Sequence, residues 1–294
     1  QQEDKMSPVN NEARLAAFEA RVSHHFADNN GTKIHFASAG EGPLVVFIHG
    51  FPDHWLTWWQ QMEVLSKTHR TVAMDLRGFN LSDHPENPSA YTPETLASDV
   101  CAVIDACGES EAVVIGHDWG GFVAWQTAML FPDKVQRLGI VNLPHPWAIA
   151  RELANNPDQQ KASGYARVFQ QPGSESKLDF DRLSTWIHDP AFRTRHMAAM
   201  ERSNRTGMLN YYRVCFPAEP YTERSDAPPP IKVPVLVVHG TEDPYVLTAG
   251  LNNLWEYVEG SLTIRAWSGV GHFVQHDAPD RLTAAFKSWI GETI

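Results

Sequence analysis

Short apolar runs alternate with amphipathic stretches along most of the chain. Runs of four or five nearly continuous apolar residues are typical of strands buried on both faces of a parallel sheet. Four such runs occur: Leu44–Ile48, Ala112–Ile115, Leu138–Val141 and Val235–Val238. The last amphipathic stretch, which follows Pro279, has helical spacing in its apolar positions Leu282, Ala285, Phe286, Trp289 and Ile290. Alternating strands and helices predict an α/β fold, with a mostly parallel sheet flanked by helices.

A long central segment breaks this rhythm. Residues 143–228 contain no clear buried strand and are rich in Trp, Tyr, His, Arg and Pro. We interpret them as a helical cap inserted between two strands, with Ala227–Pro230 as a stiff return connection. The α/β core then comprises residues 23–142 and 229–294.

The first 22 residues are polar, with a short helical pattern at Leu15, Phe18 and Val22. We expect residues 1–22 to form an extension that packs on the core. The chain begins at Gln1 instead of Met, and no charged segment followed by an apolar one is visible. Both a cytoplasmic and an exported location are therefore kept as hypotheses.

Composition narrows the classes of function. The 294 residues are 43% hydrophobic and 20% charged, which is typical of an ordinary globular chain. A net charge of −11 argues against binding to nucleic acid, whose phosphates need clustered Lys and Arg. No run approaches the roughly 20 apolar residues of a membrane span. Cys101 and Cys107 on one helix would lie about 9 Å apart, so we expect them and Cys215 to be reduced.

The segment around Asp118 has the pattern Gly-x-nucleophile-x-Gly, between a predicted strand and a helical pattern. In α/β-hydrolases such a sharp turn exposes the central side chain above the sheet. The flanking Gly116 and Gly120 leave room for this backbone. Asp118 stands where serine hydrolases carry Ser, and its carboxylate can attack an sp³ carbon and form an ester without a base. The alternative is that Asp118 only caps the following helix.

An ester on Asp118 must be hydrolysed, which requires a base that activates water. In this fold the acid and then the His follow the nucleophile in the chain. Asp243 lies just past a predicted strand end, and His272 lies in a glycine-bracketed turn before the last helix. We expect Asp243 to orient His272 and His272 to take the proton from water. Glu242 is the competing acid, and an ordinary loop histidine is the alternative for His272.

Two further patterns concern anions and metals. The turn His49-Gly50-Phe51-Pro52 follows a buried strand, and we expect the backbone N–H groups of Phe51 and Trp119 to stabilise the oxyanion of the ester's tetrahedral intermediate. The alternative is a simple tight turn. His272 and His276 have the i, i+4 spacing of a metal-binding pair, but Phe273 stands where such a motif needs Glu. We therefore expect no metal there and no cofactor.

These motifs together resemble those of the soluble epoxide hydrolases of the α/β-hydrolase fold. The resemblance extends from about residue 23 to the end and rests on four segments: the oxyanion turn His49–Pro52, the nucleophile segment Gly116–Gly121, the segment Asn142–Pro146 at the start of the cap, and a structural loop at Asp75–Ser82. Asn80 replaces the usual Gly of that loop, and Asn tolerates left-handed backbone.

The resemblance implies an epoxide substrate that is opened to a diol. Two cap tyrosines of the family hydrogen-bond the epoxide oxygen, and Tyr165 and Tyr212 match them by position. Tyr211 is the rival of Tyr212, because neighbouring side chains on a helix point about 100° apart. In addition to Trp119 and the two tyrosines, the side chains expected to contact the substrate are His49, Pro52 and Phe273.

Three other functions remain as alternatives. Haloalkane dehalogenases also use an Asp followed by Trp, but they often carry a second halide donor, Asn, where Phe51 stands here. Fluoroacetate dehalogenases carry Arg in place of Trp119 to clamp a carboxylate. A non-catalytic small-molecule receptor on this fold would often lack a catalytic side chain, whereas all the expected ones are present.

Overall fold

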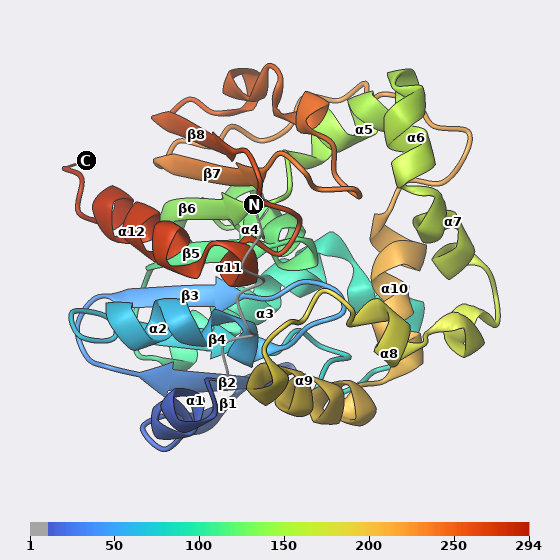
Figure 1. Ribbon diagram of the computed structural model, residues 1–294. Helices are drawn as coiled ribbons and strands as arrows, with labels where there is room; N and C mark the ends of the chain where they lie inside the picture. The colour runs from blue at the N-terminus through green and yellow to red at the C-terminus, as the bar shows by residue number, and fades with distance from the viewer. Residues whose placement is uncertain (1–10, 294) are drawn as a thin grey trace, which may run out of the picture.

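The computed structural model describes residues 11–293, with an eight-stranded sheet at its centre (Figure 1). The strand order is β1-β2-β4-β3-β5-β6-β7-β8. Strand β2 is antiparallel to both neighbours, and all the other pairs are parallel. The predicted α/β fold class is thereby confirmed. The strands are β1 (Ser23–Asn29), β2 (Thr32–Ala39), β3 (Leu44–Ile48), β4 (Arg70–Met74), β5 (Ala112–His117), β6 (Val135–Val141), β7 (Val235–Gly240) and β8 (Leu262–Trp267).

The four predicted apolar runs are the central strands β3, β5, β6 and β7. All five side chains of β3 are buried, and they alternate between two hydrophobic clusters on opposite faces of the sheet. Val46 and Ile48 face one cluster, whereas Val45 and Phe47 face the other. The other four strands were not predicted. Most residues of the edge strands β1 and β8 are partly or fully exposed, and the mostly buried β2 and β4 have polar residues such as His35 and Thr71 among their apolar ones.

Helices cover both faces of the sheet. Helix α4 packs against β5 and β6, and α3 packs against α4 and the edge strand β1. Helices α2, α11 and α12 pack together, and their buried residues belong to the hydrophobic cluster on the opposite face. The predicted inner face of α12 is confirmed, with Leu282, Ala285, Phe286 and Trp289 buried. The helices are α1 (Glu12–Glu19), α2 (Trp59–Leu65), α3 (Pro93–Ala106), α4 (Trp119–Leu130), α5 (Pro146–Asn155), α6 (Pro157–Ala162), α7 (Gly164–Gln170), α8 (Phe180–Leu183), α9 (Pro190–Arg202), α10 (Arg205–Cys215), α11 (Val274–Asp277) and α12 (Pro279–Ile290).

Helices α5 to α10 all lie in the chain between β6 and β7, and Figure 1 shows them gathered beyond one end of the sheet. We propose that residues 143–228, called the cap below, form one unit and that residues 23–142 and 229–294 form the core. In the proposed extension, residues 1–22, the first ten lie outside the described residues. Among the residues that the structure describes, no helix is long and apolar enough to cross a membrane.

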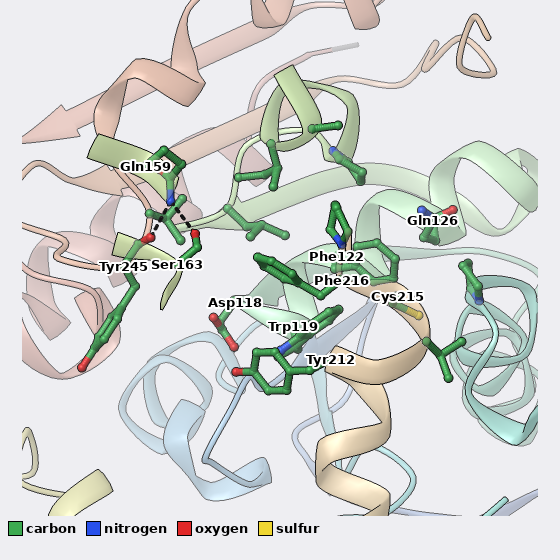
Figure 2. A pocket seen from close by; sticks show the side chains of 18 of the residues that line it. Asp118, Trp119, Phe122, Gln126, Gln159, Ser163, Tyr212, Cys215, Phe216 and Tyr245 are labelled. Atoms are coloured by element: carbon green, nitrogen blue, oxygen red, sulfur yellow. Dashed lines mark hydrogen bonds between the residues drawn. The ribbon is translucent and has the colours of Figure 1, made fainter. Parts of the chain in front are cut away.

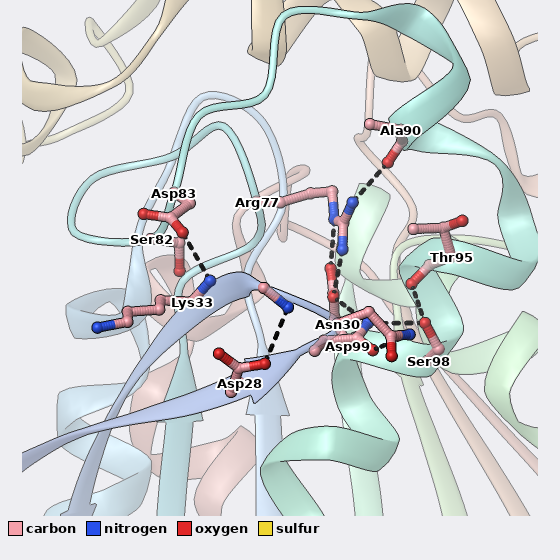
Figure 3. Close-up of polar contacts among 12 residues, drawn as sticks. Asp28, Asn30, Lys33, Arg77, Ser82, Asp83, Ala90, Thr95, Ser98 and Asp99 are labelled. Atoms are coloured by element: carbon pink, nitrogen blue, oxygen red, sulfur yellow. Dashed lines mark hydrogen bonds and ion pairs between the residues drawn. The ribbon is translucent and has the colours of Figure 1, made fainter.

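The loop Asp75–Ser82 follows β4 in the chain and contacts α10 of the cap in space. It is fixed by buried polar contacts (Figure 3). The Arg77 guanidinium donates two hydrogen bonds, of 2.7 and 2.6 Å, to Asp99 and one of 2.8 Å to the carbonyl of Ala90. Asn80 has φ +46°, which confirms the left-handed backbone expected at this position. Its amide donates to Asp75 at 2.9 Å. The loop therefore has the structural role that the resemblance implies.

Candidate active site

Asp118 occupies the sharp turn between β5 and α4. Its backbone angles are φ +54° and ψ −122°, a conformation that costs a residue other than glycine about 1–3 kcal/mol. A Cβ atom on Gly116 would come within 2.1 Å of the Gly120 carbonyl oxygen, and one on Gly120 within 2.2 Å of the Ile48 oxygen. Only glycine fits at either position, which is why the turn needs both. The strained turn pushes the Asp118 side chain out at the end of the sheet.

The Asp118 carboxylate is held by three donors. The backbone N–H of Phe51 donates to Oδ1 at 2.8 Å, and the N–H of Trp119 also donates to the carboxylate. The Nε2 atom of His272 lies 3.2 Å from Oδ2. Burial alone would raise the pKa of Asp118, but the hydrogen bond and positive charge of His272 outweigh burial and lower it. Asp118 is therefore ionised at neutral pH, as a nucleophile must be.

Asp243, just past the end of β7, accepts hydrogen bonds on both carboxylate oxygens. Nδ1 of His272 donates to Oδ2 at 2.6 Å, and the side-chain amide of Asn142 donates to the same oxygen at 2.7 Å. The backbone N–H groups of Tyr245 and Val246 donate to Oδ1 at 2.8 and 3.0 Å. Burial opposes ionisation, but the charge and hydrogen bond of His272 dominate and lower the pKa of Asp243 to about 2.

His272 bridges the two carboxylates. Burial alone would lower the pKa of its imidazole. The charge of Asp243 and the hydrogen bonds with Asp118 and Asp243 outweigh burial and raise this pKa to about 10. At neutral pH the resting site therefore holds an imidazolium between two carboxylates. The carbonyl of His272 also accepts a 2.8 Å hydrogen bond from Nε2 of His117, which fixes the turn from behind.

Two cavities, of about 400 and 280 Å³, meet at Asp118. Both are lined by Asp118, Tyr165, Tyr212 and Tyr245. Aromatic and aliphatic walls dominate the larger cavity, among them Trp119, Phe122, Leu143, Ile149 and Phe216. The smaller one has Phe51, Pro52, Phe169, Leu183, Trp186 and Phe273 in its wall. The carboxylate thus lies where two mainly apolar cavities share their lining.

Tyr165 on α7 and Tyr212 on α10 meet at this junction, with their ring centroids 5.9 Å apart and their planes edge to face. Figure 2 shows the hydroxyl end of Tyr212 directed toward Asp118, with the Trp119 ring beside it. Burial, together with the negative charge of Asp118, raises the pKa of both phenols well above the usual value, so both stay protonated. Tyr211 instead donates to the carbonyl of Arg77 at 2.8 Å and lines neither cavity.

Known proteins share this arrangement of strand, turn and helices. Residues 43–279 match the family described as alpha/beta hydrolase fold. The chain belongs to the alpha/beta hydrolase fold family. This alpha/beta hydrolase is similar to Epoxide hydrolase 3 of Xenopus tropicalis, with 29% identity over 90% of this chain and 76% of that protein. It is 35% identical to the AB hydrolase superfamily protein YfhM of Bacillus subtilis, over 76% of this chain and 83% of that protein.

A solved structure gives the same relationship. The crystal structure of an epoxide hydrolase from Bacillus megaterium in complex with an inhibitor matches this hydrolase with a TM-score of 0.83 and 30% identity. The match covers 91% of this chain and 100% of that one. The resemblance to epoxide hydrolases that the motifs predict is therefore confirmed.

His49 is one expected contact residue that this alpha/beta hydrolase does not place in the cavities. Its Nδ1 bonds to the Gly50 carbonyl at 2.7 Å, and its Nε2 accepts from the N–H of Leu76 at 3.0 Å. The side chain is fully buried and lines neither cavity beside Asp118, so its expected contact with substrate is corrected to a structural role in the turn.

The competing acid Glu242 does not bond to His272. Its carboxylate accepts a hydrogen bond of 3.1 Å from the N–H of Gly269.

Some residues of the site have no assigned role in the sequence analysis. Asn142, in the segment that starts the cap, has a positive φ of 53° and donates to Asp243. An Asn that follows a strand and precedes Leu-Pro indicates such a turn. It does not indicate that the Asn side chain bonds to Asp243. Tyr245 lines both cavities, and its ring lies edge-on to His272 at 5.4 Å. No pattern in the sequence indicates this position.

Proposed function

We propose that this protein opens epoxides to vicinal diols through a covalent hydroxyalkyl ester on Asp118. The observation that carries the proposal is the position of the Asp118 carboxylate, between two protonated phenols on one side and the His272–Asp243 pair on the other. The nucleophilic carboxylate, the phenols that donate protons and the imidazole that accepts one can then all reach the reacting epoxide and its ester. The named epoxide hydrolases among the similar proteins support this function.

The first half-reaction alkylates Asp118. Tyr165 and Tyr212 donate hydrogen bonds to the epoxide oxygen, and a carboxylate oxygen of Asp118 attacks a ring carbon. The C–O bond of the ring breaks, and the resulting alkoxide takes a proton from one phenol. The products are a hydroxyalkyl ester and a tyrosinate. The high pKa of both phenols keeps the proton available until the alkoxide, which is a far stronger base than the epoxide, develops.

The second half-reaction hydrolyses the ester. His272 takes a proton from a water molecule, whose oxygen attacks the ester carbonyl. The N–H groups of Phe51 and Trp119, which contact the resting carboxylate, then stabilise the oxyanion. When the intermediate collapses, the diol leaves and Asp118 keeps the oxygen from water. The second proton of the water leaves with the diol, and His272 keeps the first, which restores the resting imidazolium, so one epoxide and one water give one diol.

Ester formation also prepares His272 for its role as base. In the resting site two carboxylates hold the imidazole protonated. The ester of Asp118 is neutral, so no charge at Asp118 favours the imidazolium any longer, and the pKa of His272 falls. The proton that His272 loses passes through solvent to the tyrosinate, which becomes a phenol again. The base is therefore formed when the ester appears. The geometry thus separates attack, which needs ionised Asp118, from hydrolysis, which needs neutral His272.

The experiment that tests this function is a substrate panel of aryl and alkyl epoxides and chain-matched haloalkanes, with wild type and the isosteric variant Asp118→Asn. We expect the wild type to form diol from epoxides and to release no halide from haloalkanes. We expect the variant to carry out neither ester formation nor hydrolysis. Halide release without diol would assign the chain to dehalogenation, because Trp119 would then bind the halide. Diol formation by an Asp118→Asn variant whose Asn side chain is shown to be intact would refute the proposed ester intermediate.

A further inference from the structure

A second group of polar side chains is buried away from the two cavities. Asp53 and His54 follow Pro52 in the core, and His196 comes from α9 of the cap. Asp53 and His196 are 0% exposed and His54 is 2% exposed. One possible ligand atom from each residue lies within 4.8 Å of the others. A carboxylate and two imidazoles from distant segments thus converge on one point between core and cap.

Three buried atoms of this group have no hydrogen-bond partner in the described part of the chain: Oδ2 of Asp53, Nδ1 of His54 and Nδ1 of His196. Each Nδ1 atom lies 3.7 Å from the other carboxylate oxygen of Asp53, Oδ1, which is beyond hydrogen-bond distance. Oδ1 itself accepts the backbone N–H of His54 at 2.9 Å. Buried polar atoms are almost always paired, and an unpaired buried carboxylate is especially unfavourable. Three unpaired atoms in one buried cluster of possible ligands therefore point to a bound cation.

The separations suit ligands of one metal ion. Zinc binds imidazole nitrogen and carboxylate oxygen at about 2.0–2.2 Å, so two ligands at a tetrahedral angle lie roughly 3.4 Å apart. The two N···O separations of 3.7 Å need only a small contraction to reach this value. The ring of His196 is held by Ser184, whose Oγ lies 3.0 Å from Nε2. This contact leaves Nδ1 directed at Asp53, in the way that ligating histidines are oriented through their other nitrogen.

We propose that Asp53, His54 and His196 bind a divalent transition-metal ion, with zinc as the ion that this ligand set favours. The fourth position is filled by a water or by the second carboxylate oxygen. None of the three side chains lines the cavities beside Asp118, so the ion takes no part in the reaction. Its role is structural: it ties α9 to the loop that carries Phe51. This site is separate from the His272–His276 pair.

The test uses the whole protein without a histidine tag, stripped with a chelator and then titrated with zinc. Zinc content is measured by elemental analysis and stability by the melting temperature. The variants are Asp53→Asn and His196→Asn. The control is His145→Asn, because His145 is also buried with an unpartnered Nε2 but packs on Trp125 and Tyr257 instead. We expect one zinc per chain and a higher melting temperature in wild type and control, and neither effect in the two variants.

Cobalt(II) gives a measurement that does not depend on how the variants fold. Bound to stripped wild-type protein in this mixed nitrogen and oxygen site, it is expected to give the intense visible bands of a tetrahedral complex, and zinc is expected to remove them by displacement. A wild-type protein that takes up no stoichiometric zinc and shows no cobalt bands would overturn the proposal, with a buried water as the occupant. Zinc binding that survives in both folded variants would also overturn it.

Discussion

The Nε2 atom of His272 lies 3.2 Å from Oδ2 of Asp118. The proposed base and the proposed nucleophile are thus in direct contact before any substrate is bound. In this resting arrangement the charge of Asp118 contributes to the raised pKa of His272, which reaches about 10. A base that is protonated at neutral pH cannot activate water. The contact therefore makes the order of events depend on Asp118 being converted to an ester first.

Removing the charge of Asp118 is expected to lower the pKa of His272. Asp118→Asn keeps the size of the side chain but, like the ester, carries no charge. We expect a pKa for His272 clearly below the wild-type value of about 10, as measured by NMR titration of the ring. Asp243→Asn is expected to lower it as well, because the charge of Asp243 is the larger of the raising effects. An unchanged titration in both variants would contradict this account of the site.

Replacing His272 is expected to stop the reaction at the ester. In His272→Gln the backbone N–H groups of Phe51 and Trp119 still hold the carboxylate of Asp118, which can attack, but no base activates water. We expect turnover to fall by roughly 10³-fold, within the range of general-base contributions. Mass spectrometry of the variant mixed with epoxide is expected to show a protein heavier by one substrate. If the variant neither turns over nor gains mass, His272 is required for attack and the assignment of steps is wrong.

The two phenols are expected to matter for catalysis and the neighbouring Tyr211 only for stability. Tyr165→Phe and Tyr212→Phe each remove one donor to the epoxide oxygen, and we expect kcat to fall about 10²-fold for each and much further for the double variant. The matched control Tyr211→Phe loses the buried hydrogen bond to Arg77, which costs about 1 kcal/mol of unfolding free energy, while kcat stays near wild type. Near-normal kcat in both cavity variants would refute their role.

The pKa of His272 also predicts how stability depends on pH. The folded pKa of about 10 lies above the unfolded value of about 6.5, so the folded state binds this proton more tightly. The resulting stabilisation is complete below pH 6.5 and is lost as the pH rises through 10. The free energy of unfolding in urea is compared between wild type and His272→Gln. The difference isolates the contribution of His272, because the other titratable groups are present in both proteins. We expect the stability difference to shrink from pH 6.5 toward 10, and a constant difference would disprove it.

The sequence was most informative where local backbone geometry or continuous burial dictates residue type. Gly116 and Gly120 are required by contacts near 2 Å, so the turn at Asp118 could be predicted without coordinates. The buried strands β3, β5, β6 and β7 show as apolar runs, whereas the partly exposed β1 and β8 and the buried but partly polar β2 and β4 do not.

Features that arise from docking of distant segments could not be predicted. Tyr245 reaches the cavities, and Asp53 meets His196, only because the cap closes over the core. For His49 the sequence predicted a contact that the structure does not show. Its place in a motif suggested contact with substrate, but its buried ring bonds to the backbone groups of Gly50 and Leu76.

The central claim is that Asp118 forms the ester, and oxygen labelling tests it most directly. A single turnover is run in H₂¹⁸O with enzyme in excess over epoxide. We predict an unlabelled diol, whose new oxygen comes from the carboxylate, and ¹⁸O in the peptide that contains Asp118. A labelled diol from the first turnover, with Asp118 unlabelled, would mean that water attacks the epoxide directly and would contradict the account.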